Sequence, residues 1–264
     1  MTAYIYWNVR PEIFQIGPFT VRWYGLFFAI LFAVGYLIVR WQFRIEHKNE
    51  RQLDTLLVYL VVGTIVGARL GHCLFYEPDY YLRHPLQILK VWEGGLASHG
   101  GAAGVLIALY LFTRSRPEFT YLWLLDRIVV PTALGGSLIR LGNLFNSEIL
   151  GDATHVPWAF VFERVDPVPR HPAQLYEAIS YLLVFIALLL VYRRLRERTQ
   201  PGLLTGLFLV GVFTFRFLIE FVKERQATYE ANLPLSVGQL LSLPFIAAGM
   251  VLLWRAVRRG RGRG

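Results

Sequence analysis

Seven runs of mostly apolar residues divide the chain, and they constrain its fold more than any other feature. At a rise of ~1.5 Å per residue, about 20 helical residues cross the ~30 Å hydrocarbon layer of a bilayer. Backbone polar groups at that depth need partners within the protein, which a helix supplies. The sequence therefore predicts an all-α membrane protein, a single domain over 1–264. Its seven transmembrane helices are expected at about 20–40, 56–76, 95–113, 121–141, 173–192, 203–221 and 237–256.

The composition fits this interpretation and excludes other classes. Of the 264 residues, 55% are hydrophobic and 17% are charged, whereas an average soluble domain has about 25% charged residues. The single cysteine, Cys73, excludes an internal disulfide framework, and its apolar surroundings favour a packing role. No metal-ligand spacing, P-loop or GxSxG element is present. We therefore expect neither a metal nor another cofactor.

The distribution of positive charge predicts the orientation. With the amino terminus outside, fifteen of the 27 Lys and Arg residues fall in inner segments and eight in outer segments. The positive-inside rule then places the amino terminus out and the carboxy terminus in, with 142–172 as a small outer head segment. A basic tail on the inner side accounts for RGRGRG without a nucleic-acid partner, so we expect no nucleic-acid binding.

Ionisable and polar residues within the spans gather in the outer third of the membrane. They are Tyr24, Arg69, His99, Arg140, Arg216 and Glu220. Such residues mark function by default, and arginine binds phosphate through paired hydrogen bonds. The pattern predicts a site for an anion such as a lipid phosphate. Alternatively, individual arginines snorkel to the outer headgroups, or Arg69 serves helix packing. The pair Asp126–Arg127 lies near the inner side, where a local ion pair or snorkelling is expected.

The stretch GGLASHGG, 94–101, leaves two interpretations open. Glycine permits an irregular helix end, which is tolerated at membrane depth where it lines a cavity, and His99 would then face a wet pocket. Alternatively, Gly94, Gly95, Gly100, Gly101 and Gly104 form a close packing face between helices, and His99 finds its partners within the protein. The sequence alone does not decide between them.

Two further stretches carry polar residues toward the same side. In RLGNLFNSEILG, 140–151, Asn143 and Glu148 are placed to orient Arg140 or to bind glycerol hydroxyls, although capping of the helix end is the alternative. In RHPAQLYE, 170–177, a structural role is favoured, with proline in the first turn and tyrosine at the interface. The alternative is that His171, Gln174, Tyr176 and Glu177 of this stretch line the same outer face.

Six elements occur in one order along the chain: WYGL (23–26), GARLG (67–71), EGGLASHGG (93–101), RLGNLFNSEILG (140–151), RHPAQLYE (170–177) and FRFLIEF (215–221). Together they resemble the prolipoprotein diacylglyceryl transferase family, from about residue 10 to 250. The resemblance implies a seven-span, multi-pass protein of the bacterial inner membrane with a small periplasmic head. By motif match, the family's important residues fall on Tyr24, His99, Arg140, Asn143, Glu148, Gly151, Arg216 and Glu220. The chain departs from the family pattern at Val212, Leu150 and 223–226.

The resemblance also implies the reaction. The diacylglyceryl group of phosphatidylglycerol is transferred to the lipobox cysteine of a prolipoprotein signal peptide, which forms a thioether and releases glycerol phosphate. Such a displacement needs a base for the thiol and fixed cations for the departing phosphate. We expect His99 to be the base, with Glu148 or water as the alternative. Arg140 and Arg216 are expected to hold the phosphate.

The other expected contacts are with the lipid. We expect Asn143 and Glu148 to hold the glycerol headgroup, and Tyr24, Arg69, Gly151 and Glu220 to complete the substrate site. A monomer is expected. The competing class is a lipid or anion transporter with an outer-leaflet phosphate site, which would place polar residues at both leaflets.

Overall fold

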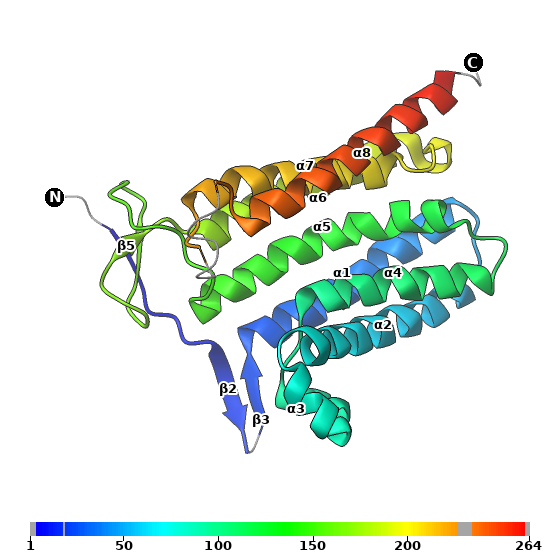
Figure 1. The fold of residues 1–264 in the computed structure, drawn as a ribbon. Coiled ribbons are helices and arrows are strands. Elements are labelled where there is room, and N and C mark those ends of the chain that lie inside the picture. Colours follow the sequence, from blue (N-terminus) through cyan, green and yellow to red (C-terminus); the bar gives the residue numbers. More distant parts are fainter. Residues whose placement is uncertain (1–3, 18, 226–233, 262–264) are drawn as a thin grey trace. The chain divides into compact units, whose positions relative to one another are not determined.

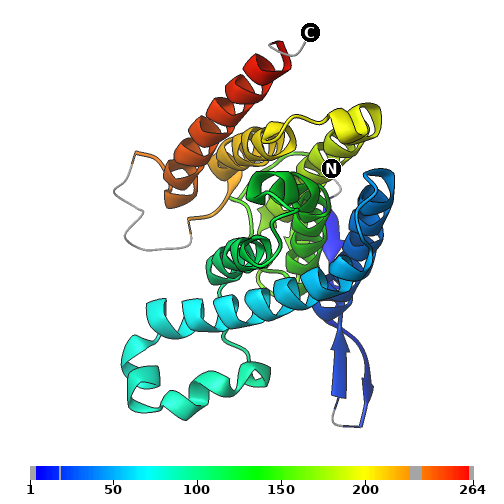
Figure 2. The ribbon, with the colours of Figure 1, turned by 90° about the vertical axis from the view of Figure 1, so that its right-hand side faces the viewer.

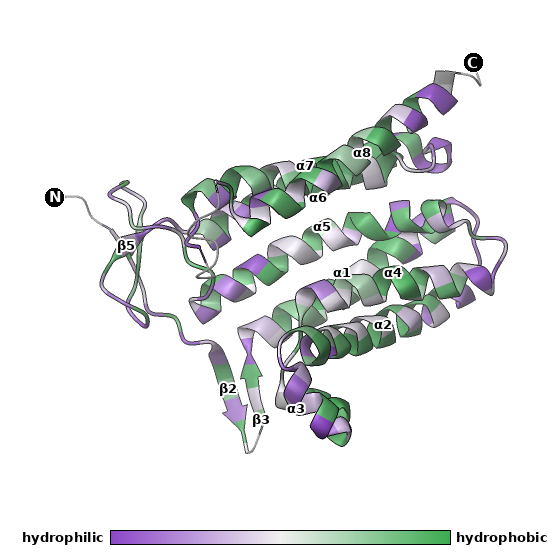
Figure 3. Ribbon diagram, in the orientation of Figure 1, coloured by the Kyte–Doolittle hydropathy of each residue, from purple (hydrophilic) through white to green (hydrophobic). Residues whose placement is uncertain are grey.

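The computed structural model describes residues 4–17, 19–225 and 234–261, and it has a helix at each predicted apolar run (Figure 1). These helices are α1 (Trp23–Ile45), α2 (Arg51–Phe75), α4 (Ser98–Arg114), α5 (Tyr121–Asn146), α6 (Ala173–Leu195), α7 (Leu203–Ile219) and α8 (Val237–Arg261). Within the described residues, six helices are long and apolar enough to cross a membrane, all of these except α4. Hydrophobic residues run along them, and hydrophilic residues gather mainly near their ends (Figure 3). The predicted all-α membrane class is confirmed.

The third predicted span forms a shorter helix than expected. Helix α4 has 17 residues and begins at Ser98, and such a helix is ~26 Å long, short of the ~30 Å hydrocarbon layer. The residues before it leave helical geometry, because Gly94 and Gly95 have φ values of +91° and +67°, which glycine adopts without steric cost. The structure therefore supports six spans, and a seventh stays a prediction.

The chain divides into two compact units. The first, Arg40–Leu125, contains α2 and α4, joined by α3 (Pro78–Arg83), η1 (Pro85–Leu89) and η2 (Val91–Glu93), which extend away from the two long helices (Figure 2). Glycines bring α2 and α4 together: a methyl group at Gly71 would lie 2.8 Å from the Cα atom of Gly100, and one at Gly104 would lie 3.0 Å from that of Gly67. The structure thus favours the packing interpretation for these α4 glycines.

The second unit, Met1–Val39 with Asp126–Gly264, contains most of α1 and α5, the helices α6, α7 and α8, and a small sheet. Strand β1 (Ile5–Trp7) pairs in parallel with β4 (Phe160–Phe162), which pairs antiparallel with β5 (Pro169–Arg170). Residues near the amino terminus therefore join the predicted head segment. Phe160 and Phe162 of β4 form a small buried core with Leu144 and Leu150.

Shorter elements complete this unit. Strands β2 (Glu12–Ile16) and β3 (Phe19–Arg22) form a separate antiparallel hairpin directly before α1 (Figure 1). Two short helical turns follow long helices: η3 (Arg196–Arg198) comes directly after α6, and η4 (Glu220–Val222) comes directly after α7.

The buried carboxylate of Asp126 caps a neighbouring helix. It accepts hydrogen bonds from the Gly202 N–H at 2.7 Å and from the Thr205 N–H and hydroxyl at 2.8 and 2.6 Å. These backbone N–H groups are the unpaired donors at the start of α7. The sequence expectation of a local ion pair or snorkelling did not include this capping role, because the capped residues belong to a helix far along the chain.

Candidate active site

Arg140 is fixed in place near the end of α5. Its Nε atom lies 2.9 Å from Oε2 of Glu177, a fully buried residue on α6. Its Nη1 atom donates to Oδ1 of Asn143, one helical turn further along, at 3.2 Å. The guanidinium is therefore held by an ion pair with a carboxylate of α6 and by a hydrogen bond to an amide of its own helix.

The chain of contacts continues into the turn after α5. Asn143 donates from Nδ2 to Oε2 of Glu148 at 3.3 Å, and Asn146 donates to the other carboxylate oxygen at 2.6 Å. Asn143 is buried, whereas Glu148 is exposed. The structure thus brings together Arg140, Asn143 and Glu148, which sequence reasoning grouped from one short stretch.

A buried lysine extends this cluster. The Nζ atom of Lys223 lies 3.3 Å from Oε2 of Glu220 and 3.7 Å from Oε1 of Glu177. Lys223 is only 7% exposed, and a lysine at this depth needs such paired carboxylates. Glu177 therefore joins two cations, Arg140 and Lys223, and we call these two cations with Glu177 and Glu220 the charge cluster.

Arg216 differs from Arg140 in having no such restraint. It lies in the last turn of α7 and is half-buried. Among the residues that the structure describes, none forms a hydrogen bond or ion pair with its guanidinium. Its five donors are therefore not taken up by those residues and can meet an anionic ligand.

Two predicted site residues pack closely against the backbone. A methyl group at Gly142 would lie 2.5 Å from Cδ2 of Tyr24, so the tyrosine ring rests on this part of α5. Gly151 is buried between two chain segments, because its N–H donates to the carbonyl of His171 and a methyl group there would lie 2.8 Å from the carbonyl oxygen of Val222. Only glycine fits such close backbone approach.

Arg69 and His99 belong to the other unit, Arg40–Leu125. Arg69 is 3% exposed and donates to the carbonyls of Gln87, Ile88, Gly94 and Gly95 at 2.6 to 3.3 Å. It therefore fixes the connection between α2 and α4, and its expected contact with the lipid stays a prediction. His99 lies in the first turn of α4 and is exposed, without a hydrogen bond to any other described residue.

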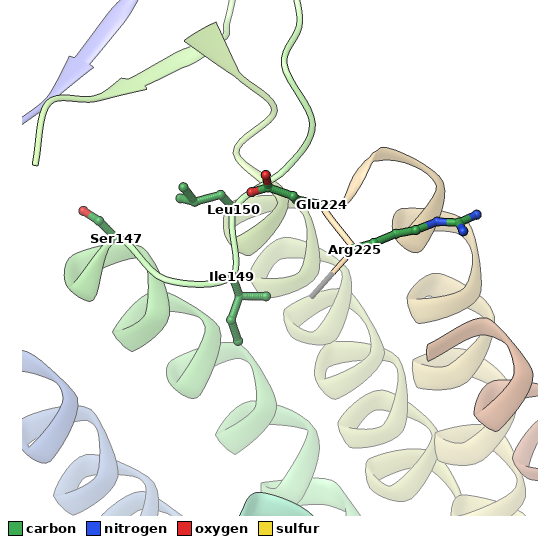
Figure 4. A pocket seen from close by; sticks show the side chains of 5 residues that line it. All are labelled: Ser147, Ile149, Leu150, Glu224 and Arg225. Carbon is green, nitrogen blue, oxygen red and sulfur yellow. The ribbon is translucent and has the colours of Figure 1, made fainter. Parts of the chain in front are cut away.

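A cavity of about 370 Å³ lies beside the turn after α5. Its lining residues come from the turn after α5 and from the segment after η4 (Figure 4): Ser147, Ile149, Leu150, Glu224 and Arg225. A second cavity of about 390 Å³, within Arg40–Leu125, is lined by Arg69 and by His72, Glu77 and Tyr81 among others. Within the described part of the chain, no three His, Cys, Asp or Glu side chains are arranged to hold a metal ion.

An ion-pair network supports the loops beside the first cavity. Arg170 donates to Asp166 at 2.7 Å, to Glu224 at 3.2 Å and to the carbonyl of Gly151 at 3.4 Å. The hydrogen bond from Arg170 holds the pKa of the Asp166 carboxyl below its usual value. The network ties the segment before α6 to the segment after η4.

Sequence reasoning missed two members of the charge cluster. Glu177 was given a structural role as the favoured interpretation, and Lys223 was noted only as a departure from a family pattern. Only the spacing along the chain could have indicated these two residues. Glu177 lies three residues after Gln174 on one helix face, and Lys223 follows Glu220 at the same spacing.

The long apolar helices define an integral membrane protein. Arginine, lysine and carboxylate side chains that pair with one another inside it form a built polar site. The comparisons then specify the family. The model of the family described as prolipoprotein diacylglyceryl transferase matches residues 11–255, and the chain belongs to this family. A phosphatidylglycerol–prolipoprotein diacylglyceryl transferase of Chloroherpeton thalassium is 54% identical over 260 residues, which cover 98% of this chain and 97% of the relative.

Other relatives of the same name agree. The protein of Tolumonas auensis is 54% identical over 94% of this chain and 96% of its own length. That of Bacteroides fragilis is 43% identical over 95% of this chain and 94% of its own length. The family resemblance expected from six sequence elements is confirmed.

Proposed function

We propose that the protein transfers the diacylglyceryl group of phosphatidylglycerol to the lipobox cysteine of prolipoproteins. The match to the transferase family over residues 11–255 carries this proposal, and the relatives named above cover nearly the whole chain. The product is a thioether on the cysteine, and glycerol phosphate is released. The substrates are thus one membrane lipid and one membrane-anchored signal peptide.

The reaction exchanges a carbon–oxygen bond for a carbon–sulfur bond. The thiolate attacks the glycerol carbon that carries the phosphate, and the electrons of the broken bond leave on the phosphate oxygen. Arg140 and Arg216 hold this phosphate in two different ways. The contact with Glu177 fixes Arg140 before substrate binds, whereas Arg216 has no hydrogen-bond or ion-pair partner among the described residues and turns toward the lipid.

The remaining residues orient the substrates. Asn143 and Glu148 bind the hydroxyls of the glycerol headgroup, while Tyr24, Gly151 and Glu220 shape and support the same site. His99 accepts the proton of the thiol; its exposed position in the first turn of α4 leaves the ring accessible to the peptide.

This function also implies a topology. Helix α4 is the seventh span, and the glycine-lined contact with α2 supports it within the bilayer despite its 17 residues. The amino terminus and the head segment face the periplasm, the carboxy terminus faces the cytoplasm, and a monomer in the bacterial inner membrane is sufficient for the reaction. No metal or cofactor takes part, because phosphatidylglycerol brings its own leaving group.

The direct test is incubation of the purified protein with phosphatidylglycerol vesicles and a synthetic lipobox peptide. Mass spectrometry is expected to show one added diacylglyceryl group on the cysteine, and none on the matched peptide with serine in its place. An unmodified cysteine peptide would contradict the transferase. Movement of lipid between leaflets without peptide modification would instead favour the transporter.

A further inference from the structure

The turn that carries Glu148 is strained on both sides of that residue. Ser147 and Ile149 have φ values of +55° and +57°, in the left-handed region that residues other than glycine seldom adopt. Ile149 is β-branched, which makes this conformation a true outlier. Such residues persist only where their surroundings impose the geometry, and they cluster at functional sites.

A buried side chain of α6 bonds the backbone at the middle of this turn. Gln174 is fully buried on α6, and its Nε2 atom donates to the backbone carbonyl of Glu148 at 2.6 Å. A carbonyl only accepts hydrogen bonds, so this partner fixes which end of the amide faces the turn. The other end, Oε1, has no hydrogen-bond partner among the described residues. The fully buried Gln174 side chain therefore makes one hydrogen bond among the described residues, and that bond goes to the turn.

The same turn of α6 supports both ends of the Arg140 network. Gln174 and Glu177 lie three residues apart and so share one helix face. Glu177 contacts Arg140, while Gln174 bonds the carbonyl of Glu148. Between them, Asn143 links the Arg140 guanidinium to the Glu148 carboxylate. The start of α6 thus sets the distance between the cation and the carboxylate.

We propose that Gln174 is a positioning residue that holds the strained turn 147–149 and thereby fixes the Glu148 carboxylate against Asn143. The inference rests on the proposed function, because Glu148 is assigned there to the lipid headgroup. Without the bond, Ile149 relaxes to an ordinary φ value and Glu148 rotates away. The arginines still bind the phosphate, but the lipid is misaligned, so kcat falls more than KM rises.

The test uses Gln174→Met, which keeps the side-chain volume and removes the donor. In the full-length purified protein with phosphatidylglycerol and a lipobox peptide, kcat is expected to fall about tenfold or more, with KM for the lipid within about threefold of the original. Ser137→Ala is the matched control: its hydroxyl donates to the Ala178 carbonyl at 2.7 Å, another buried bond between α5 and α6. The control is expected to lower Tm as much as Gln174→Met does while retaining kcat.

Relief of strain provides the second readout. Glycine adopts the φ value of Ile149 without steric cost, so adding Ile149→Gly to Gln174→Met is expected to raise kcat by about threefold or more. The Tm effects of the two substitutions are expected to be non-additive, because each changes the same strained turn. This thermal readout does not depend on the reaction.

The outcomes separate the two proposals. If the parent protein is active, the transferase proposal stands. In that case an unchanged kcat in Gln174→Met, or no gain of kcat in the double variant, overturns the positioning role. A parent protein that modifies no peptide contradicts the transferase. The Tm values of the parent, the two single variants and the double variant then test Gln174 by themselves, because additive effects on Tm overturn its role in holding the turn.

Discussion

Replacing Glu177 by glutamine tests whether charge, rather than hydrogen bonding alone, holds the site together. The substitution keeps the shape of the side chain and an oxygen that accepts hydrogen bonds, but it removes the negative charge between Arg140 and Lys223. Glu220 remains as a partner for Lys223 at 3.3 Å. Arg140 instead loses its only ion-pair partner among the described residues.

The expected magnitude follows from burial. Glu177 is fully buried and the Arg140 side chain is 14% exposed, at an N–O distance of 2.9 Å. Removing one partner of a buried pair costs ~3–5 kcal/mol because a charge is left uncompensated. The glutamine oxygen still accepts the hydrogen bond that the Tyr181 hydroxyl donates to Glu177 at 3.4 Å, which retains about 1 kcal/mol. A loss of about 3 kcal/mol corresponds to a Tm lower by roughly 6–12 °C for a chain of this size.

The matched control is Glu224→Gln, which changes another arginine–carboxylate pair. Glu224 lies 3.2 Å from Arg170, but its side chain is 53% exposed, and exposed pairs contribute about 0–1 kcal/mol. Tryptophan fluorescence during thermal unfolding in detergent measures both variants, and Glu177→Gln is also expected to lower kcat. Equal Tm changes in the two variants would refute the reasoning from burial.

Three further predictions follow from the geometry. His99→Gln is expected to abolish thioether formation, measured by peptide mass at neutral pH; a substantial retained rate would remove His99 as the base. Gly104→Ala is expected to lower Tm, because the added methyl group would meet the α2 backbone. Gly101→Ala, whose methyl group would have its nearest neighbour at 3.6 Å, is expected to leave Tm equal or higher. A lower Tm for Gly101→Ala than for Gly104→Ala would contradict the packing. Hydrogen bonds from two α1 arginines lower the pKa of Glu50 from 4.5 to about 2, so its stabilising effect is present above pH 4.5 and is lost as the pH falls toward 2. The Tm difference between the parent and Glu50→Gln is expected to shrink over that range, and a constant difference would contradict the assignment.

Part of the candidate site was predictable from sequence because its members are close together along the chain. Arg140, Asn143 and Glu148 lie within one short stretch, and helical spacing places the first two on one face. The structure brings these three together as expected. The role of Lys223 was not predictable, since its partner Glu177 comes from another helix and only folding brings the two charges within 3.7 Å.

Arg69 shows a set of contacts that local reasoning could not foresee. An arginine within a span suggested an anion site, but the four carbonyls that bind it lie 18 to 26 residues further along the chain. Sequence spacing carries no information about whether a returning loop will offer its carbonyls to a particular guanidinium. Burial and donor geometry, which only the folded chain has, decide that Arg69 is occupied.

The sequence by itself determined the class of the protein and the positions of its helices. Hydropathy and backbone hydrogen bonding act within one segment, so each apolar run specifies a helix without knowledge of its neighbours. Only the tertiary structure decided which charges are neutralised, which glycines are packed, and that the turn 147–149 is strained between Asn143 and Gln174. Those properties depend on contacts between segments that are distant in the chain, and their energies exist only once the segments have met.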